Sequence, residues 1–523
     1  MNLDAFWNDL HYEQIHFRDS LQFELQADVA PSPDAKVSIS TQELYFFIPQ
    51  ALQINQYTYS KEQFYKDRTN LIRFKTPEFT FRALVDRDNH QSPLRRIGRL
   101  HEGAVGSEEQ FAIQDEMKLL GNVVRSALRT AVKDYIERLS DIKSVSAYEE
   151  ISQAISAFCD DIMKFREAFW QLNPRSRSKW PEQVISCYLC VDEFISHSLD
   201  YYLTGFLQHT RSLNIEHLHA IDRKLCNLIA TEKEHRRSAF QEPLEIAKEA
   251  ESVKERLLYH KGVLSKYVMD ALLLQILRTS WMERYGNILA AAAAGIAMLI
   301  YVLLIFLNVP YFGFNSLPFL LLTVLLYILK DRVKDSLKAM FHQHAVRLFS
   351  DYTTEIHMPN GEKNLGEVKE FFSFVQPHDL PDTIKMIRKS RFEQDLPEFR
   401  PPETVLYYKK ETLLNEKLAS RRSRRRKLHN IFLFNVHLLL EKASDPIESG
   451  CSLDPNTMEI RELRLPKVYY LNIIMKSSAA VETNGEEYRA FRVVLDKNGI
   501  KKVEPLPIDE NNTTAQATSG DSR

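Results

Sequence analysis

The longest uncharged segment of this chain lies between Arg284 and Lys330, and it limits the fold more than any other feature. Leu, Ile, Ala, Phe and Val supply most of it, whereas 26% of the whole chain is charged and its mean hydropathy is -0.32. The hydrocarbon core of a bilayer is about 30 Å thick, and ~20 apolar helical residues cross it. The segment therefore predicts membrane insertion; the alternative is a helical hairpin buried in a large soluble core.

The uncharged segment divides into two predicted helices. Residues 288–307 form a full span, about 30 Å long at 1.5 Å per residue. Asn308, Pro310 and Gly313 then favour a reversal of the chain. Residues 317–329 form a return helix of only about 20 Å, which interfacial aromatic residues or a locally thinner bilayer would accommodate.

Basic residues flank the predicted hairpin on both sides, and its connecting loop has none. Because positive flanks stay in the cytoplasm, we expect an integral membrane protein with two spans and cytoplasmic N- and C-termini. The membrane would be the plasma or inner membrane in a bacterium. The predicted spans contain no ionisable residue on which transport could depend. The flanking residues are Arg278, Arg284, Lys330, Arg332, Lys334 and Lys338.

Small residues recur four positions apart in the first predicted span. One set is Gly286, Ala290 and Ala294, and a second is Ala291 and Gly295. Such spacing favours a close helix–helix contact, either with the second span or with another copy of the chain. The alternative is that alanine is present only because it favours a helix.

The soluble parts complete an α+β integral membrane protein, with a cytosolic helical bundle and β-rich N-terminal and C-terminal parts. Alternating apolar residues predict strands in 15–87, with 79–85 among them. Ser107–Gln110 resembles a capping box, and further helices are expected near 147–172, 181–208 and 214–240. The expected domains are 1–105 (β-rich), 106–284 (helical bundle), 285–330 (transmembrane hairpin), 331–400 (cytosolic helix and linker), 401–507 (β-rich) and 508–523 (disordered tail). Because both β-rich parts would lie on one side of the membrane, they could pack together as one body.

The strongest periodic pattern outside the hairpin runs from Ile246 to Leu274. Its positions step by alternating four and three residues over about four heptads, which is typical of a coiled-coil seam. No proline follows before Pro310, so one continuous helix could enter the first span. We favour the last helix of the bundle over a self-associating stalk.

Six positive charges lie within seven residues just before the final strands. Like charges repel and stay solvated, so such a block usually meets an anionic partner. Anionic lipid headgroups are the nearest candidate, at ~1 kcal/mol per basic residue near the surface. RNA or an acidic protein patch is a second option, and a loop without a ligand is a third. The block comprises Arg421, Arg422, Arg424, Arg425, Arg426 and Lys427.

Patterns with metal or redox spacing occur, but none predicts a site. Cys187 and Cys190 have no second pair to complete a zinc site, so buried free thiols are expected. His342 and His344 lie two residues apart, and side chains at that spacing diverge on a helix. Glu-x-x-His pairs occur at Glu13/His16, Glu216/His219 and Glu232/His235, and the polar surroundings of the last two pairs indicate solvated faces. We predict no catalytic residue, no metal site and no cofactor.

These patterns favour a membrane-anchored, cytosol-facing scaffold, adaptor or regulatory protein without catalytic activity. Its expected partners are the lipid bilayer, anionic headgroups and a second copy, which would bind through 246–274 or the first span. A protein partner stays open, and the net charge of -2 argues against general nucleic-acid binding. The alternatives are a membrane-anchored enzyme with a cytosolic site and an oligomeric channel or transport subunit.

Overall fold

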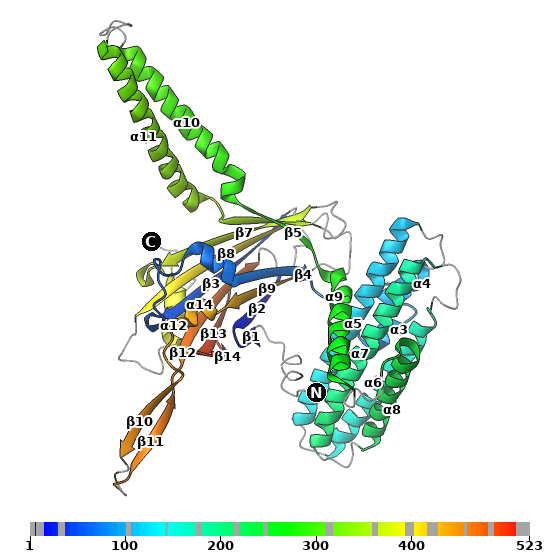
Figure 1. The fold of residues 1–523 in the computed structure, drawn as a ribbon. Coiled ribbons are helices and arrows are strands. Elements are labelled where there is room, and N and C mark those ends of the chain that lie inside the picture. The colour runs from blue at the N-terminus through cyan, green and yellow to red at the C-terminus, as the bar shows by residue number, and fades with distance from the viewer. Residues whose placement is uncertain are drawn as a thin grey trace, which may run out of the picture.

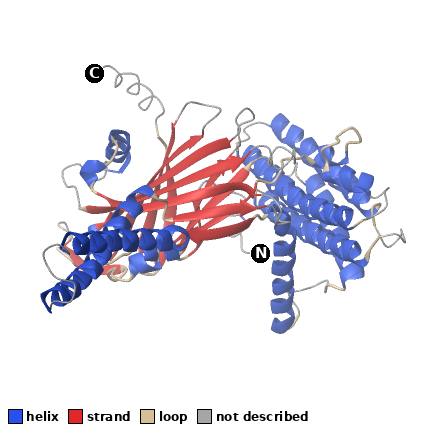
Figure 2. Ribbon diagram, turned by 90° about the horizontal axis from the view of Figure 1, so that it is seen from above, coloured by secondary structure: helices blue, strands red, loops and turns tan. Residues whose placement is uncertain are grey.

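The computed structural model shows a β body, a helical bundle on one flank and two long helices that project from the sheet edge (Figures 1 and 2). The fold is mixed α and β, with large antiparallel sheets. The structure describes residues 6, 15–29, 37–100, 106–141, 145–173, 180–213, 219–243, 249–308, 317–357, 364–392, 402–415, 427–453, 455, 458–479 and 486–508.

Two antiparallel sheets face each other in the β body. The small sheet has the order β1-β2-β9-β4 and the large sheet the order β14-β13-β12-β3-β8-β7-β6-β5. The small sheet consists of β1 (Ile15–Asp19), β2 (Gln22–Val29), β4 (Arg68–Phe74) and β9 (Leu428–Asn435). The large sheet consists of β3 (Val37–Pro49), β5 (Gln275–Ser280), β6 (Tyr352–His357), β7 (Asn364–Val375), β8 (Glu403–Asn415), β12 (Tyr469–Ala479), β13 (Glu486–Asp496) and β14 (Gly499–Leu506).

Aromatic side chains fill the space between the sheets, because alternate residues of each strand point to the same face. Phe46 of β3 contacts Phe432 of β9, with ring centroids 6.0 Å apart. Helix α2 (Lys61–Asp67) adds Phe64, which stacks on Phe372 at 4.2 Å. On the opposite face of the large sheet, helix α12 (Asp382–Phe392) covers Phe47 and its neighbours.

The N-terminal and C-terminal β-rich parts share both sheets. Strand β3 pairs with β8 on one side and β12 on the other, and β9 lies between β2 and β4. Strands from the ranges 1–105 and 401–507 therefore belong to one β body, together with β5, β6 and β7 from the middle of the chain. Opposite ends of the chain thus meet in a single core.

Five long helices form the bundle, in which α7 packs against α5, α8 and α9. Helix α5 begins one residue after Gly106, whose backbone N–H donates to the Glu109 carboxylate at 3.0 Å. The predicted capping box at Ser107–Gln110 is therefore displaced by one residue. The helices are α5 (Ser107–Ser140), α6 (Val145–Trp170), α7 (Glu182–Ser212), α8 (His219–Phe240) and α9 (Glu251–Met269), preceded by α3 (Phe81–Val85) and α4 (Pro93–Leu100).

The prediction of a strand at 79–85 was wrong, because this segment forms helix α3. The Thr80 side chain accepts a hydrogen bond from the Ala83 backbone N–H at 3.2 Å, which caps the helix. Phe81 and Leu84 are both buried, and a spacing of three places them on one helix face.

The continuous helix that could have run from 246 into the first span is interrupted. Helix α9 ends at Met269, the turn η5 (Asp270–Leu272) follows, and β5 enters the large sheet before the next helix begins. The buried residues of α9, Leu264 and Val268, face the bundle. The heptad pattern therefore describes a bundle helix, and Ile246 lies outside the described residues.

The linker predicted in 331–400 contains two strands of the large sheet. Strand β6 pairs with β5, and β7 lies between β6 and β8. Residues Val368, Glu370 and Phe372 of β7 alternate inward. The prolines of this range are confined, among the described residues, to the ends of short helices such as η6 (Pro377–Asp379).

Two protrusions leave the β body in opposite directions (Figure 1). One is the pair of helices α10 (Trp281–Asn308) and α11 (Leu317–Leu348). The other is a ribbon of β10 (Ile447–Leu453) and β11 (Ile460–Pro466), nearly all of whose residues are exposed. The short helix α14 (His437–Leu440) lies in the β body before the ribbon.

Candidate functional site: a projecting helical hairpin and the polar interior at its base

Helices α10 and α11 lie side by side and extend well beyond the sheet (Figure 1). Among the described helices, the segment Arg284–Leu307 alone is long and apolar enough to cross a membrane, and 11% of its most apolar window is buried. Large apolar side chains such as Leu299 and Phe306 are 67% and 74% exposed. Apolar surface of this extent is unfavourable in water and indicates an apolar environment or partner.

Two ring contacts fix how α10 and α11 are aligned. Tyr301 meets Tyr327 edge-on at 6.4 Å near the tip, and Tyr285 stacks on Phe349 at 5.3 Å near the base. In this antiparallel register, the part of α11 beyond Leu329 lies beside α10 residues that precede Leu299. The charged residues that begin at Lys330 are therefore level with the apolar middle of α10.

The small residues that contact α11 differ in part from those predicted. Ala293 and Ala297 are 0% and 1% exposed, and both lie on the packed side of α10. Gly286 and Ala290 are partly buried on the same side. The remaining predicted residues, Ala291, Ala294 and Gly295, are exposed. Helical spacing explains the shift, because the packed side follows steps of four and three rather than four alone.

The hairpin is inserted between two strands that already pair with each other. Ser280, the last residue of β5, is opposite Tyr352, the first residue of β6. Arg284 at the base of α10 lies 3.8 Å from the Glu355 carboxylate of β6. The helices thus begin and end at the same edge of the large sheet.

Directly beneath that edge, the space between the two sheets is polar. Glu370 of β7 is 1% exposed and accepts hydrogen bonds from Arg68, Asn70 and the Tyr408 hydroxyl. Arg278 of β5 stacks over the Tyr352 ring at 3.7 Å, and its Nε lies 3.9 Å from Glu370. Burial and the neighbouring Arg68 charge both lower the pKa of Arg278.

Lys410 of β8 is buried beside this cluster, directly opposite Glu370 in the sheet register. Burial lowers the pKa of its ammonium to about 8, because desolvation and the nearby Arg68 outweigh the attraction of Glu370. On the other side, Asp351 is paired with Lys61 at 2.7 Å and the Tyr65 hydroxyl at 2.8 Å. The interior thus contains more cationic than anionic groups.

Lys410→Met is expected to raise the free energy of unfolding at neutral pH, when measured in a buffer without phosphate. Between pH 8 and 10.5 the unfolded chain keeps a proton that folded Lys410 has released, so wild-type stability rises with pH there. Below pH 8 Lys410 is charged in both the folded and the unfolded state, so the folded protein bears the full cost of burying the ammonium. The lowering of its pKa from 10.5 to about 8 corresponds to about 3 kcal/mol. Denaturant titrations should therefore show an advantage of Lys410→Met at pH 7 that shrinks toward pH 10.5. Half-buried Lys409→Met is the matched control; a less stable Lys410→Met protein at pH 7 would contradict the account.

A second buried ionic network crosses the helical bundle. The Arg166 guanidinium donates to both Glu232 oxygens at 2.7 and 3.0 Å and to Asp192 at 2.9 Å. His235 lies 2.9 Å from the other Asp192 oxygen. Burial would raise the pKa of Asp192, but the His235 hydrogen bond and the Arg166 charge lower it. Glu232 and His235 thus serve an ion network, and the prediction of a solvated face for this pair was wrong.

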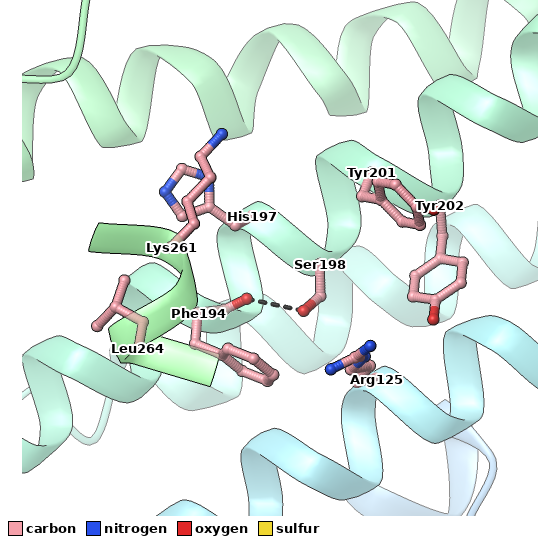
Figure 3. A pocket seen from close by; sticks show the side chains of 8 residues that line it. All are labelled: Arg125, Phe194, His197, Ser198, Tyr201, Tyr202, Lys261 and Leu264. Carbon is pink, nitrogen blue, oxygen red and sulfur yellow. Dashed lines mark hydrogen bonds between the residues drawn. The ribbon is translucent and has the colours of Figure 1, made fainter. Parts of the chain in front are cut away.

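A pocket of about 290 Å³ lies among α5, α7 and α9 (Figure 3). Figure 3 shows His197 beside Lys261 at one end of the pocket and Arg125 below Tyr202 at the other. Two of its three basic side chains are near carboxylates, because Lys261 lies 3.8 Å from Glu242 and His197 is close to Glu193 and Glu242.

Most other predicted features lie elsewhere or outside the described residues. Arg421, Arg422, Arg424, Arg425 and Arg426 lie outside them, as do the hairpin loop 309–316 and residues 509–523. Cys187 is buried and Cys190 partly buried, both as free thiols, and burial raises the pKa of Cys187 to about 11. Within the described residues, no group of three or more potential ligands is arranged to hold a metal ion.

The residues of the polar interior were missed by the sequence analysis. Their signal is a charge at an inward position of a strand, since Tyr408, Lys410 and Thr412 alternate on one buried face. Glu370 occupies the same kind of position in β7. Arg68 and Arg278 belong to short strands that only the assembled sheets bring together.

Comparisons with known proteins add no relationship to this picture: no family model, curated protein or solved structure matches the chain.

Proposed function

We propose that this protein is a non-catalytic scaffold held at the cytosolic face of a membrane by the α10–α11 hairpin. The main support is the exposed apolar surface of α10, which projects beyond the soluble body instead of packing into it. A bilayer would cover that surface and remove its cost in water. Both ends of the hairpin leave from one sheet edge, so the bundle and the β body would lie on one side.

In this proposal α10 crosses the hydrocarbon core and the apolar part of α11 returns. The depth of the hairpin is limited by α11, whose charge-free part, Leu317–Leu329, is about 20 Å long. Charged side chains are costly at the bilayer centre, so Lys330 and the residues after it belong at the headgroups. The ammonium of Lys330 lies 3.9 Å from the Tyr327 ring centre, and a tyrosine–lysine pair suits an interface.

The scaffold role draws on the two protrusions of the β body. The hairpin would attach the body to the membrane, while the β10–β11 ribbon points the other way and exposes both of its strands. A two-stranded ribbon is only marginally stable by itself in water, so a partner would add stability. Cross-linking of the detergent-extracted protein should therefore yield adducts through the ribbon; monomers alone would argue against a scaffold.

Spin labels on α11 test the proposed depth. A label on Leu321→Cys should collide with dissolved oxygen, and a label on Lys334→Cys should collide with a water-soluble nickel complex. Both positions are exposed on the helix surface, so the pair differs mainly in distance from the tip. If both labels contact the aqueous reagent in reconstituted membranes, the hairpin is not inserted.

A further inference from the structure

A cavity of about 180 Å³ lies in the polar interior at the base of the hairpin. Strand β4 of the small sheet forms one wall, and β5, β6 and β7 of the large sheet form the other. Its polar lining includes Arg68, Asn70, Arg278, Thr354 and Glu370. The feature to explain is why two arginines share a small cavity with a single carboxylate.

The charges around the cavity are not balanced. Glu370 is matched by Arg68, which hydrogen-bonds to it, and Asp351 is matched by Lys61. Arg278, with a 3.9 Å approach to Glu370, and buried Lys410 therefore have no carboxylate of their own among the described residues. Charges removed from water require a counter-charge, so the interior favours an anion.

A hydrogen-bond donor is also left over. The Arg68 side chain is 3% exposed, and its Nε has no hydrogen-bond partner among the described residues. Arg278 is 35% exposed and is held against the Tyr352 and Tyr65 rings, at 3.7 and 5.4 Å. One arginine thus lies deep in the cavity and the other lies nearer solvent. Guanidinium groups match the oxygens of phosphate in geometry as well as charge.

We propose that this cavity binds a small oxyanion of the phosphate type, with Arg68, Arg278 and the Thr354 hydroxyl as donors. The site does not depend on membrane insertion, because all of its residues belong to the two sheets. Arg278 is on β5, the strand that leads into α10, so the same chemistry could come from free phosphate or from a phosphomonoester lipid headgroup. Lys410 would stabilise the bound anion through its charge.

The test measures the thermal midpoint of the full-length protein in detergent, with inorganic phosphate against chloride at equal ionic strength. We expect a saturable rise of about 2 to 5 °C with phosphate. Arg278→Gln should abolish the rise, whereas Arg464→Gln, which removes an exposed charge on the ribbon, should preserve it. Because Arg278 is partly exposed, its replacement should fold, and circular dichroism verifies this.

A second variant and a vesicle assay complete the test. Thr354→Val keeps every charge and should weaken the phosphate response at least threefold in apparent affinity. Flotation assays compare phosphatidylcholine vesicles that contain phosphatidic acid with vesicles that contain phosphatidylserine at equal charge. This comparison distinguishes a phosphomonoester lipid headgroup from free phosphate as the source of the anion. A preference for phosphatidic acid that Arg278→Gln removes identifies a lipid headgroup, and a response to phosphate alone identifies a soluble ligand. A midpoint unaffected by phosphate, or equal responses of the two arginine variants, would overturn the proposal.

Discussion

Replacement of Trp281–Ser350 by a short Gly/Ser linker is expected to move the protein from the membrane fraction to the soluble fraction. Ser280 and Tyr352 are paired neighbours, so the linker only has to close a β-hairpin between β5 and β6. Asp351 is kept because it accepts hydrogen bonds from Lys61, Tyr65 and the Phe372 backbone N–H. The shortened protein should resist aggregation and keep its cooperative unfolding, measured by sedimentation after carbonate washing and by thermal denaturation.

Removal of the other protrusion is the matched control for this experiment. A variant whose ribbon, residues 447–466, is replaced by a similar linker should stay in the membrane fraction, because it retains α10 and α11. If the hairpin-deleted protein still sediments with washed membranes, another part of the chain provides the attachment. The basic block at 421–427 would then be the next candidate.

Arg166→Met is expected to destabilise the helical bundle by about 3 to 5 kcal/mol. The substitution leaves Asp192 and Glu232 buried without their shared cation, and these side chains are 4% and 1% exposed. It also removes the packing of the guanidinium over the Trp170 ring, at 4.6 Å. Denaturant titration of the hairpin-deleted protein, followed by far-ultraviolet circular dichroism, would measure the loss.

Lys164→Met supplies the control on the same helix. Lys164 is 66% exposed, so its replacement should change stability by less than about 0.5 kcal/mol. A triple variant in which Arg166, Asp192 and Glu232 all become apolar should regain much of the loss, since no buried charge stays unpaired. Equal stability of Arg166→Met and Lys164→Met would show that the network contributes little.

Local patterns predicted much of the secondary structure. The helices near 147–172 and 181–208 correspond to α6 and α7, because apolar spacing in a bundle is strong and prolines separate the segments. The sequence Asp-Lys-Asn-Gly at 496–499 is typical of a hairpin turn, and the structure has this turn between β13 and β14, with the Asp496 carboxylate accepting from the Asn498 and Gly499 backbone N–H groups. Turn chemistry of this kind depends on neighbouring residues alone.

Features that depend on distant partners could not be predicted. Strand β5 is six residues long and exposed along most of its length, so only its pairing with β6 across the hairpin defines it. Arg166 meets Glu232 and Asp192 from two other helices, and a single sequence shows polar residues without showing that they converge. The cavity beneath the hairpin joins β4 to β5, which are separated by the whole helical bundle.

The most direct test of the proposed anchor compares two thiols in sealed vesicles whose cytosolic face is outward. Cys451, exposed on the β10–β11 ribbon, reports on the soluble body, and Leu317→Cys places a thiol at the first residue of α11, which is 73% exposed. The account predicts that a membrane-impermeant maleimide labels Cys451 at once and labels the cysteine at position 317 only after detergent is added. Equal labelling of both thiols in intact vesicles would contradict it.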